Sequence, residues 1–399
     1  MINSLMSVKN IWIYGAGFIG TKVAEMLIKR GVIIAGFVTS SERKSFVPNL
    51  NIKTYVIDDI LTYDEDSLFI IATEEKRRSD RLDIENVLIK KGFSNIVFWK
   101  DIDIENYWLG HNYHFIARKR DLKKVCFVLA GYKVFLWKDV FSRLERFVPK
   151  DVEVCILSSG KYDDELNRIA EKNNWSYLYT DYNSVTYIQN VAISLYNKAE
   201  FIFKMDEDMF LTENCFEKLQ STYNDVTEKE PYNIGFVAPL IPINGYGHIR
   251  ILDILDKRKE YEERFDKVLY GCQPNQKLES SIEAAKYMWG AGEYIPMLDD
   301  LNNIISSKKL GYSFCNVRFS IGFILFHRDL WKDMWGFSVS GNPDMGIDEE
   351  ELCMHCMKQS YAIAVSEESV VGHFSFGPQT EEMKEFYLSN RDFFVANNT

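Results

Sequence analysis

The chain has few prolines and no long apolar runs. Nine prolines among 399 residues, with 46% hydrophobic residues, describe a packed globular protein rather than a disordered one. No apolar stretch reaches the length of a membrane span, and the opening residues MINSLMSVKN lack the apolar segment of a signal peptide. We therefore expect a protein without membrane spans that works in the cytoplasm or peripherally at the inner face of the membrane.

Positive charge is also in short supply. The 47 basic residues are outnumbered by 58 acidic ones, which gives a formal net charge of -11. This balance argues against general binding to nucleic acid, so no nucleic-acid partner is expected. The seven cysteines are odd in number and scattered, which fits reduced thiols. The one close pair, Cys353 and Cys356, lies in a helix-like segment without the second pair that a zinc site needs.

The first hundred residues alternate between strand-like and helix-like segments. The stretch NIWIYGAGFIGTKVAEMLIKRGVIIAGFVTSS predicts a strand, a glycine turn, a helix and a second strand. Further strand-like runs follow in KTYVID, SLFIIAT and NIVFW, with a helix around RLDIENVLIKKG. Because this order is typical of a doubly wound parallel sheet, we expect an N-terminal Rossmann-like α/β domain over residues 1–110.

The glycine turn of this domain consists of Gly15, Gly17 and Gly20 in a GxGxxG pattern between a strand and a helix. In that context the pattern is typical of dinucleotide-binding turns. The second strand, however, ends in VTSS at 38–41 and not in an acid that would hold a ribose, which disfavours NAD(P) as the cofactor. The domain resembles the small nucleotide-sugar-binding modules of bacterial sugar acyltransferases. We therefore favour a binding, regulatory or structural module over an active oxidoreductase for this domain.

A second α/β series begins after a segment, 111–123, that loses the alternation and is predicted to be a linker. Strand-like runs in KKVCFVLAGYK, DVEVCILSS, SYLYT and EFIFKM alternate with helices, so a second α/β domain is expected over 124–399. Residues 212–310 mix helical segments with glycines and aromatics. They are expected to form an inserted, mostly helical lobe.

Three carboxylates, Asp206, Glu207 and Asp208, follow the fourth strand of this second series directly. Open parallel sheets bind their ligands at the carboxyl ends of the strands. An Asp-x-Asp there can hold Mg²⁺ or Mn²⁺ through oxygen ligands, and the cation can bridge the two phosphates of a nucleotide-diphosphate donor. The alternative is a solvated turn between strand and helix.

Downstream, SIGFILFHRDLWKDMWGFSVSGNPDMGIDEEEL gives a glycine-containing strand, a helix ending in Gly-Phe, a loop and an acidic helix start. With the acidic triplet, this order resembles the GT-A glycosyltransferases, most closely the family 2 type, over residues 124 to about 377 outside the lobe. The resemblance implies that Glu349 is the general base. The Asp-Glu order differs from the Glu-Asp of the family, so Asp348 and Glu350 remain rivals.

The resemblance also implies a metal and donor site. Asp208 and His373 would bind Mn²⁺ or Mg²⁺, with Asp206 near the metal or the ribose. Implied donor contacts are Ala130, Gly131, Tyr132, Ser158 and Asn190. Candidate phosphate contacts are Lys133, Lys161, Lys204 and Arg318. Three aromatic residues could stack on a sugar acceptor, but we favour a place in the core for them: Trp289, Tyr294 and Tyr246.

The resulting expectation is a metal-dependent, non-processive, inverting glycosyltransferase. It would move a sugar from a nucleotide-sugar donor to a glycan or lipid-linked glycan acceptor in bacterial surface polysaccharide or glycoconjugate synthesis. The Gln-x-x-Arg-Trp signature of processive synthases is absent from the sequence. The alternative is an NAD(P)-dependent or nucleotide-sugar-modifying enzyme that uses the glycine turn.

Overall fold

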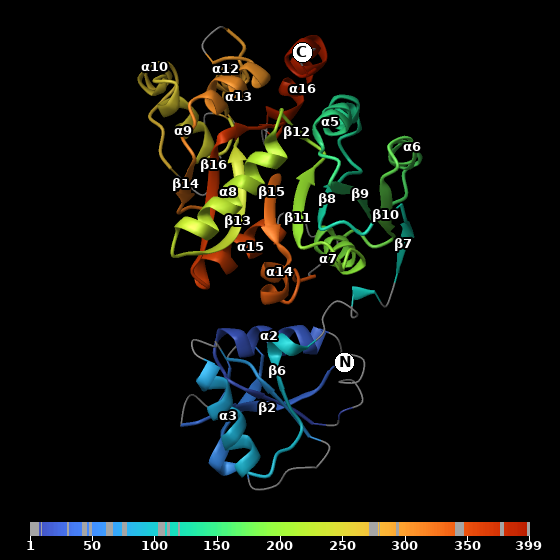
Figure 1. The fold of residues 1–399 in the computed structure, drawn as a ribbon, viewed down its shortest axis with the longest axis vertical. Helices are drawn as coiled ribbons and strands as arrows, with labels where there is room; N and C mark the ends of the chain where they lie inside the picture. Colours follow the sequence, from blue (N-terminus) through green and yellow to red (C-terminus); the bar gives the residue numbers. More distant parts are fainter. Residues whose placement is uncertain are drawn as a thin grey trace. The chain divides into compact units, whose positions relative to one another are not determined.

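The structure is a computed structural model (Figure 1) that describes residues 8, 10–29, 32–41, 46–47, 50–60, 67–73, 78–102, 108–109, 112–118, 120–270, 278, 280–292, 295–339, 347–375 and 379–396. Contacts divide the chain into two compact units, Met1–Gly110 and His111–Thr399.

The described residues of the first unit form a six-stranded sheet with the order β3-β4-β2-β1-β5-β6. Every pair is parallel except β3 with β4. The chain starts at β1 in the middle and adds strands outward on both sides, so the expected doubly wound sheet is confirmed. Its elements are β1 (Ile11–Tyr14), α2 (Phe18–Lys29), β2 (Ile34–Thr39), β3 (Phe46–Val47), β4 (Ile52–Val56), a 3₁₀ turn (Ile57–Asp59), β5 (Leu68–Ile71), α3 (Arg78–Lys90), β6 (Ile96–Phe98) and a 3₁₀ turn (Trp99–Asp101).

The second unit is built on a mixed sheet with the order β14-β16-β13-β15-β11-β8-β9-β10-β7. Its strands are β7 (Tyr113–Ile116), β8 (Lys124–Leu129), β9 (Val152–Ser159), β10 (Ser176–Thr180), β11 (Phe201–Asp206), β13 (Asn233–Leu240), β14 (Tyr312–Cys315), β15 (Phe323–His327) and β16 (Tyr361–Val370), and the short β12 (Met209–Phe210) and β17 (Gly372–His373) form a separate pair. Its helices are α5 (Val134–Phe147), α6 (Asp164–Lys172), α7 (Val185–Leu195), α8 (Cys215–Lys229), α9 (Gly247–Ile254), α10 (Arg258–Arg264), α12 (Ile282–Met288), α13 (Leu298–Ser307), α14 (Arg328–Met334), α15 (Ile347–Lys358), α16 (Thr380–Ser389) and a 3₁₀ turn (Arg391–Phe393).

The strands β11, β8, β9 and β10 run parallel, so their carboxyl ends share one edge of the sheet. In this register Asp206 pairs with Leu129, and Leu129 pairs with Leu157. All residues of β9 are buried, as expected for a strand that is covered on both faces. This edge is therefore where the acidic triplet was expected to face a ligand.

Two expected boundaries fall elsewhere. The predicted linker at 111–123 contains β7, which pairs antiparallel with β10 at the edge of the sheet. The predicted insertion at 212–310 begins too early, because α8 contacts the sheet and β13 lies between β15 and β16 inside it. The mostly helical part begins at α9 and gathers at one side of the sheet (Figure 1).

Burial settles some smaller expectations. Tyr246 and Trp289 are core residues, as expected, and Tyr294 lies outside the described residues. Cys353 and Cys356 lie in α15 with free, buried thiols. Over the described part of the chain, no helix combines the length and apolar character that a membrane crossing requires.

Candidate functional site

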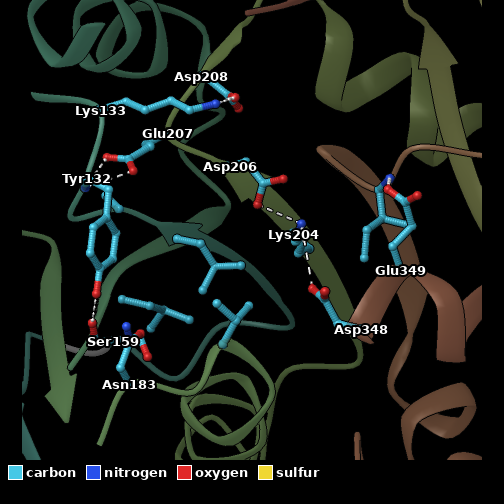
Figure 2. A pocket seen from close by; sticks show the side chains of 15 residues that line it. Tyr132, Lys133, Ser159, Asn183, Lys204, Asp206, Glu207, Asp208, Asp348 and Glu349 are labelled. Carbon is cyan, nitrogen blue, oxygen red and sulfur yellow. Dashed lines mark hydrogen bonds and ion pairs between the residues drawn. The ribbon is translucent and has the colours of Figure 1, made fainter. Parts of the chain in front are cut away.

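A cavity of about 200 Å³ opens at the carboxyl edge of the parallel strands (Figure 2). It brings together the ends of β8, β9 and β11 and the start of α15, which are far apart in the sequence. It is lined by Leu129, Ala130, Tyr132, Lys133, Leu157, Ser159, Asn183, Val185, Lys204, Asp206, Glu207, Asp208, Ile321, Asp348 and Glu349.

The end of β11 brings both a cation and an anion to the cavity. Side chains alternate along a strand, so Lys204 and Asp206 lie on the same face, and Lys204 Nζ lies 2.6 Å from Asp206 Oδ1. Burial lowers the pKa of Lys204, but the neighbouring carboxylates Asp206 and Asp348 outweigh burial and raise it. Burial raises the pKa of Asp206 to about 6, although Lys204 opposes the rise. A protonated lysine and a readily protonated carboxyl therefore share the cavity wall.

Asp208 meets residues from two other elements. Its Oδ2 is paired with Lys133 Nζ, and His373 Nε2 lies 3.4 Å from the same oxygen. Pairing of β12 with β17 places Met209 opposite His373, and Phe374 donates its backbone N–H to Asp208 O at 2.9 Å. Burial raises the pKa of Asp208, but the charges of His373 and Lys133 outweigh burial and hold this pKa below its usual range.

These groups fit a divalent cation. Asp208 Oδ1 is buried and has no hydrogen-bond partner among the described residues, so a carboxylate lone pair is left over beside His373 Nε2. The described residues hold no cluster of three or more His, Cys, Asp and Glu side chains that could bind a metal. Mg²⁺ commonly takes one or two protein carboxylates and completes its shell with water and substrate phosphates. The sharing of one cation by Asp208 and His373 stays a prediction.

Glu207, the middle acid of the triplet, is held by hydrogen bonds from the turn between β8 and α5 and from α5 itself. Glu207 is 8% exposed and accepts hydrogen bonds from Gly131 N at 2.9 Å, Tyr132 N at 2.9 Å and Trp137 Nε1 at 2.6 Å. These bonds tie the end of β11 to the turn between β8 and α5. This role of Glu207 was not predicted from the sequence. No local pattern separates Glu207 from the acids on either side, because Glu207 and Asp208 lie in the turn after β11 and not in the strand.

The four acids at the start of α15 also diverge. Asp348 is buried, and its Oδ2 accepts from Gln189 Nε2 at 2.9 Å and lies 3.9 Å from Lys204 Nζ. Glu349 is partly exposed and meets Arg318 Nε at 2.6 Å.

The remaining two acids lie outside the cavity lining. Glu350 faces solvent, whereas Glu351 accepts from the backbone N–H and the hydroxyl of Ser338. Asp348 and Glu349 therefore remain the two acids of this run that reach the cavity.

The implied donor contacts divide into two groups. Ala130 and Tyr132 line the cavity, and the backbone of Gly131 lies between them. Ser158 is fully buried, and its neighbour Ser159 lines the cavity instead, where its carbonyl accepts from Tyr132 Oη at 2.8 Å.

Asn190 is not a donor contact in this structure. It is fully buried, and its amide donates to Phe337 O and accepts from Phe337 N and Trp331 Nε1, each at 2.8 Å. These bonds hold the Gly-Phe end of α14, and Asn190 lies outside the cavity lining. Because its polar atoms are used inside the protein, the sequence-based assignment of Asn190 to the donor site is corrected.

The glycine turn of the first unit combines packing with open space. Gly15 has a positive φ of 115°, and a Cβ on Gly20 would lie 1.9 Å from Gly15 O. Gly17 is exposed, and no described atom lies within 4 Å of where its Cβ would be. Gly15 and Gly20 are thus required by the turn itself, whereas Gly17 leaves room for a ligand. Cofactor binding by the three glycines stays a prediction.

No family model matches the chain, and no curated protein matches it. One similar solved structure is the mannosyltransferase PcManGT from Pyrobaculum calidifontis in complex with GDP-Man and Mn²⁺, at 14% identity over 75% of this chain and 69% of that chain, with a TM-score of 0.36. Another is a mycobacterial protein, at 12% identity over 74% and 79%, with a TM-score of 0.34. Likeness at this level carries no argument about this chain.

Proposed function

We propose that this chain is a metal-dependent glycosyltransferase that moves a sugar from a nucleotide-diphosphate donor to an acceptor hydroxyl. One observation supports it above all: a single cavity unites a metal-type carboxylate, Asp208, with an accessible acid, Glu349, that comes from α15. The two residues lie 141 positions apart in the sequence. A displacement at an anomeric carbon needs both a group that deprotonates the acceptor and a positive charge near the leaving diphosphate.

Glu349 is the proposed general base. Arg318 Nε, at 2.6 Å, and the backbone N–H of Ile321, at 3.3 Å, hold its carboxylate in place at the cavity. The side chain of Glu349 is 23% exposed, whereas Asp348 is buried, so an acceptor hydroxyl reaches Glu349 more easily. Proton transfer from that hydroxyl to Glu349 accompanies attack on the sugar in a single inverting displacement.

The leaving diphosphate needs positive charge on the opposite side. The ammonium of Lys133 reaches Asp208 from the turn between β8 and α5 and can pair with a phosphate. A divalent cation held by Asp208 and His373 would neutralise charge on the leaving group. We take the acceptor to be a glycan or lipid-linked glycan of a bacterial surface polymer, with one sugar transferred per visit, on the resemblance of residues 124–377.

A second candidate function belongs to the first unit, where the space at Gly17 favours nucleotide binding. It would support an NAD(P)-dependent or nucleotide-sugar-modifying enzyme. The second strand ends in Thr39, whose hydroxyl donates to Ser41 O at 3.0 Å, and offers no acid for a ribose. We therefore place this function second.

The test is a donor screen that follows nucleoside diphosphate release with Mn²⁺ or with EDTA. We expect Mn²⁺-dependent release that falls at least a hundredfold in Asp208→Asn and in Glu349→Gln, since single catalytic groups are worth about 10²–10⁴ in rate. Glu350→Gln, on the same helix turn but exposed, is the matched control and should turn over normally, as should Gly17→Val. Undiminished release by both Asp208→Asn and Glu349→Gln would overturn the proposal.

A further inference from the structure

A lysine is buried in the wall of the cavity. Lys204 and Asp348 are each 4% exposed, and Gln189, which donates to Asp348, is 3% exposed. Buried charges are rare and costly unless they are paired. Lys204 Nζ has two acidic neighbours, Asp206 Oδ1 at 2.6 Å and Asp348 Oδ2 at 3.9 Å, and lies between them in Figure 2.

This arrangement joins two elements that are far apart in the sequence. Lys204 and Asp206 belong to β11, whereas Asp348 stands in the first turn of α15. Gln189 adds a contact from α7 to the same oxygen of Asp348. The start of α15 is therefore held against the sheet by a cation from one side and an amide from the other, and the next residue along α15 is Glu349.

The charges show what Lys204 contributes. The formal charges of Asp206, Asp348 and Lys204 sum to a single net negative charge on this part of the wall. Without Lys204 the two carboxylates would lose the cation that lies between them, and like charges repel strongly at low dielectric. The first turn of α15 would be pushed away from β11, and Glu349 would move with it.

We propose that Lys204 is a positioning residue for the transfer reaction, which bridges Asp206 to Asp348 and thereby places Glu349, and that Asp348 is the buried counter-ion of this bridge and not the general base. The inference rests on the proposed function for its kinetic consequences. The bridge itself is a property of the folded chain.

Three variants test the assignment: Lys204→Met, Asp348→Asn and the double variant. Lys204→Met keeps most of the length of the side chain and removes the charge, so we expect kcat to fall at least tenfold with a smaller change in the donor KM. The double variant restores the single net negative charge, so its kcat should recover severalfold over Lys204→Met. Asp348→Asn alone should retain at least a tenth of wild-type kcat, far above Glu349→Gln. The exposed Lys229→Met serves as the matched control.

Thermal unfolding of the same set separates this inference from the proposed function. Removal of one partner of a buried ion pair should lower Tm by about 10 °C in Lys204→Met, and the double variant should regain several degrees. This recovery is expected even if no donor is turned over, in which case only the proposed function fails. The inference is overturned if the Tm effects of Lys204→Met and Asp348→Asn simply add. In an active enzyme it is also overturned if Asp348→Asn is as inactive as Glu349→Gln, or if Lys204→Met keeps the kcat of the wild type.

Discussion

Replacement of Glu207 by glutamine tests whether its hydrogen bonds hold the end of β11 to the turn between β8 and α5. The carboxylate accepts from Gly131 N and Trp137 Nε1 at one oxygen, Oε2, and from Tyr132 N chiefly at the other, Oε1. Glutamine has nearly the same shape but only one acceptor oxygen. If that oxygen keeps Gly131 and Trp137, the amide NH₂ faces the N–H of Tyr132, and two donors meet.

The magnitude follows from this mismatch. A buried donor left without an acceptor costs about 1–3 kcal/mol, and the loss of charge from the remaining hydrogen bonds acts in the same direction. For a unit of this size each kcal/mol corresponds to roughly 2–4 °C in Tm, so Glu207→Gln should lower Tm by about 5 °C. The turn between β8 and α5 also carries Tyr132 and Lys133 into the cavity, so affinity for a nucleoside diphosphate should fall several-fold.

Thermal unfolding by circular dichroism and calorimetric titration with GDP and UDP measure these two effects. Glu228→Gln on α8, which replaces an exposed acid of the same unit, is the control and should behave as the wild type. If Glu207→Gln matches the control in both Tm and nucleotide affinity, the hydrogen bonds of Glu207 do not hold the turn, and the reasoning is refuted.

Three further outcomes are expected. Burial lowers the pKa of His248 to about 4. Below pH 6.5 the unfolded chain therefore takes up a proton that the native state does not, and the free energy of unfolding should fall by about 1.4 kcal/mol per pH unit, roughly 3 kcal/mol by pH 4. Urea titrations should show this extra slope in the wild type and not in His248→Gln. Gly20→Ala, whose Cβ would lie 1.9 Å from a backbone oxygen of the glycine turn, should destabilise the first unit in hydrogen exchange, whereas Gly17→Ala, with nothing within 4 Å, should not. Lys133→Met should raise the affinity for Mn²⁺ about tenfold, or about 1.4 kcal/mol, because the ammonium no longer competes for Asp208. A Mn²⁺ titration followed by electron paramagnetic resonance measures this affinity, and unchanged or weaker binding would contradict the expectation.

The sequence alone could predict the parts of the site that follow from strand and helix order. Parallel strands end at a common edge, so the position of Asp206 and Asp208 at the end of a strand was enough to place them at the edge where the cavity opens. The acidic helix start at Asp348 and Glu349 was expected from the order of the downstream elements. The cavity brings these two segments together.

The remaining features depend on contacts that no local pattern reveals. Asn190 looked available for a donor, but its partners Trp331 and Phe337 lie 141 and 147 positions away. Lys204 looked like a candidate phosphate contact, but its neighbour Asp348 is likewise distant in the sequence. Short edge strands such as β7 carry too few residues to show a period of two, which is why it was taken for a linker.

Three of the cavity carboxylates are engaged in ion pairs, which decides how a substrate enters. Asp208 is paired with Lys133, Asp206 with Lys204, and Glu349 with Arg318. A phosphate that binds one of these cations, or a metal ion that takes the paired carboxylate oxygen, must therefore exchange partners with an existing ion pair.

For Asp208 this exchange has a direction. A cation that takes its carboxylate frees the ammonium of Lys133 beside the bound charge, and a diphosphate that takes Lys133 leaves Asp208 open to a cation. Cation and diphosphate should consequently bind with positive cooperativity, because each removes the partner that opposes the other. This coupling would be weaker in Lys133→Met, where the cation gains affinity and the diphosphate loses its contact.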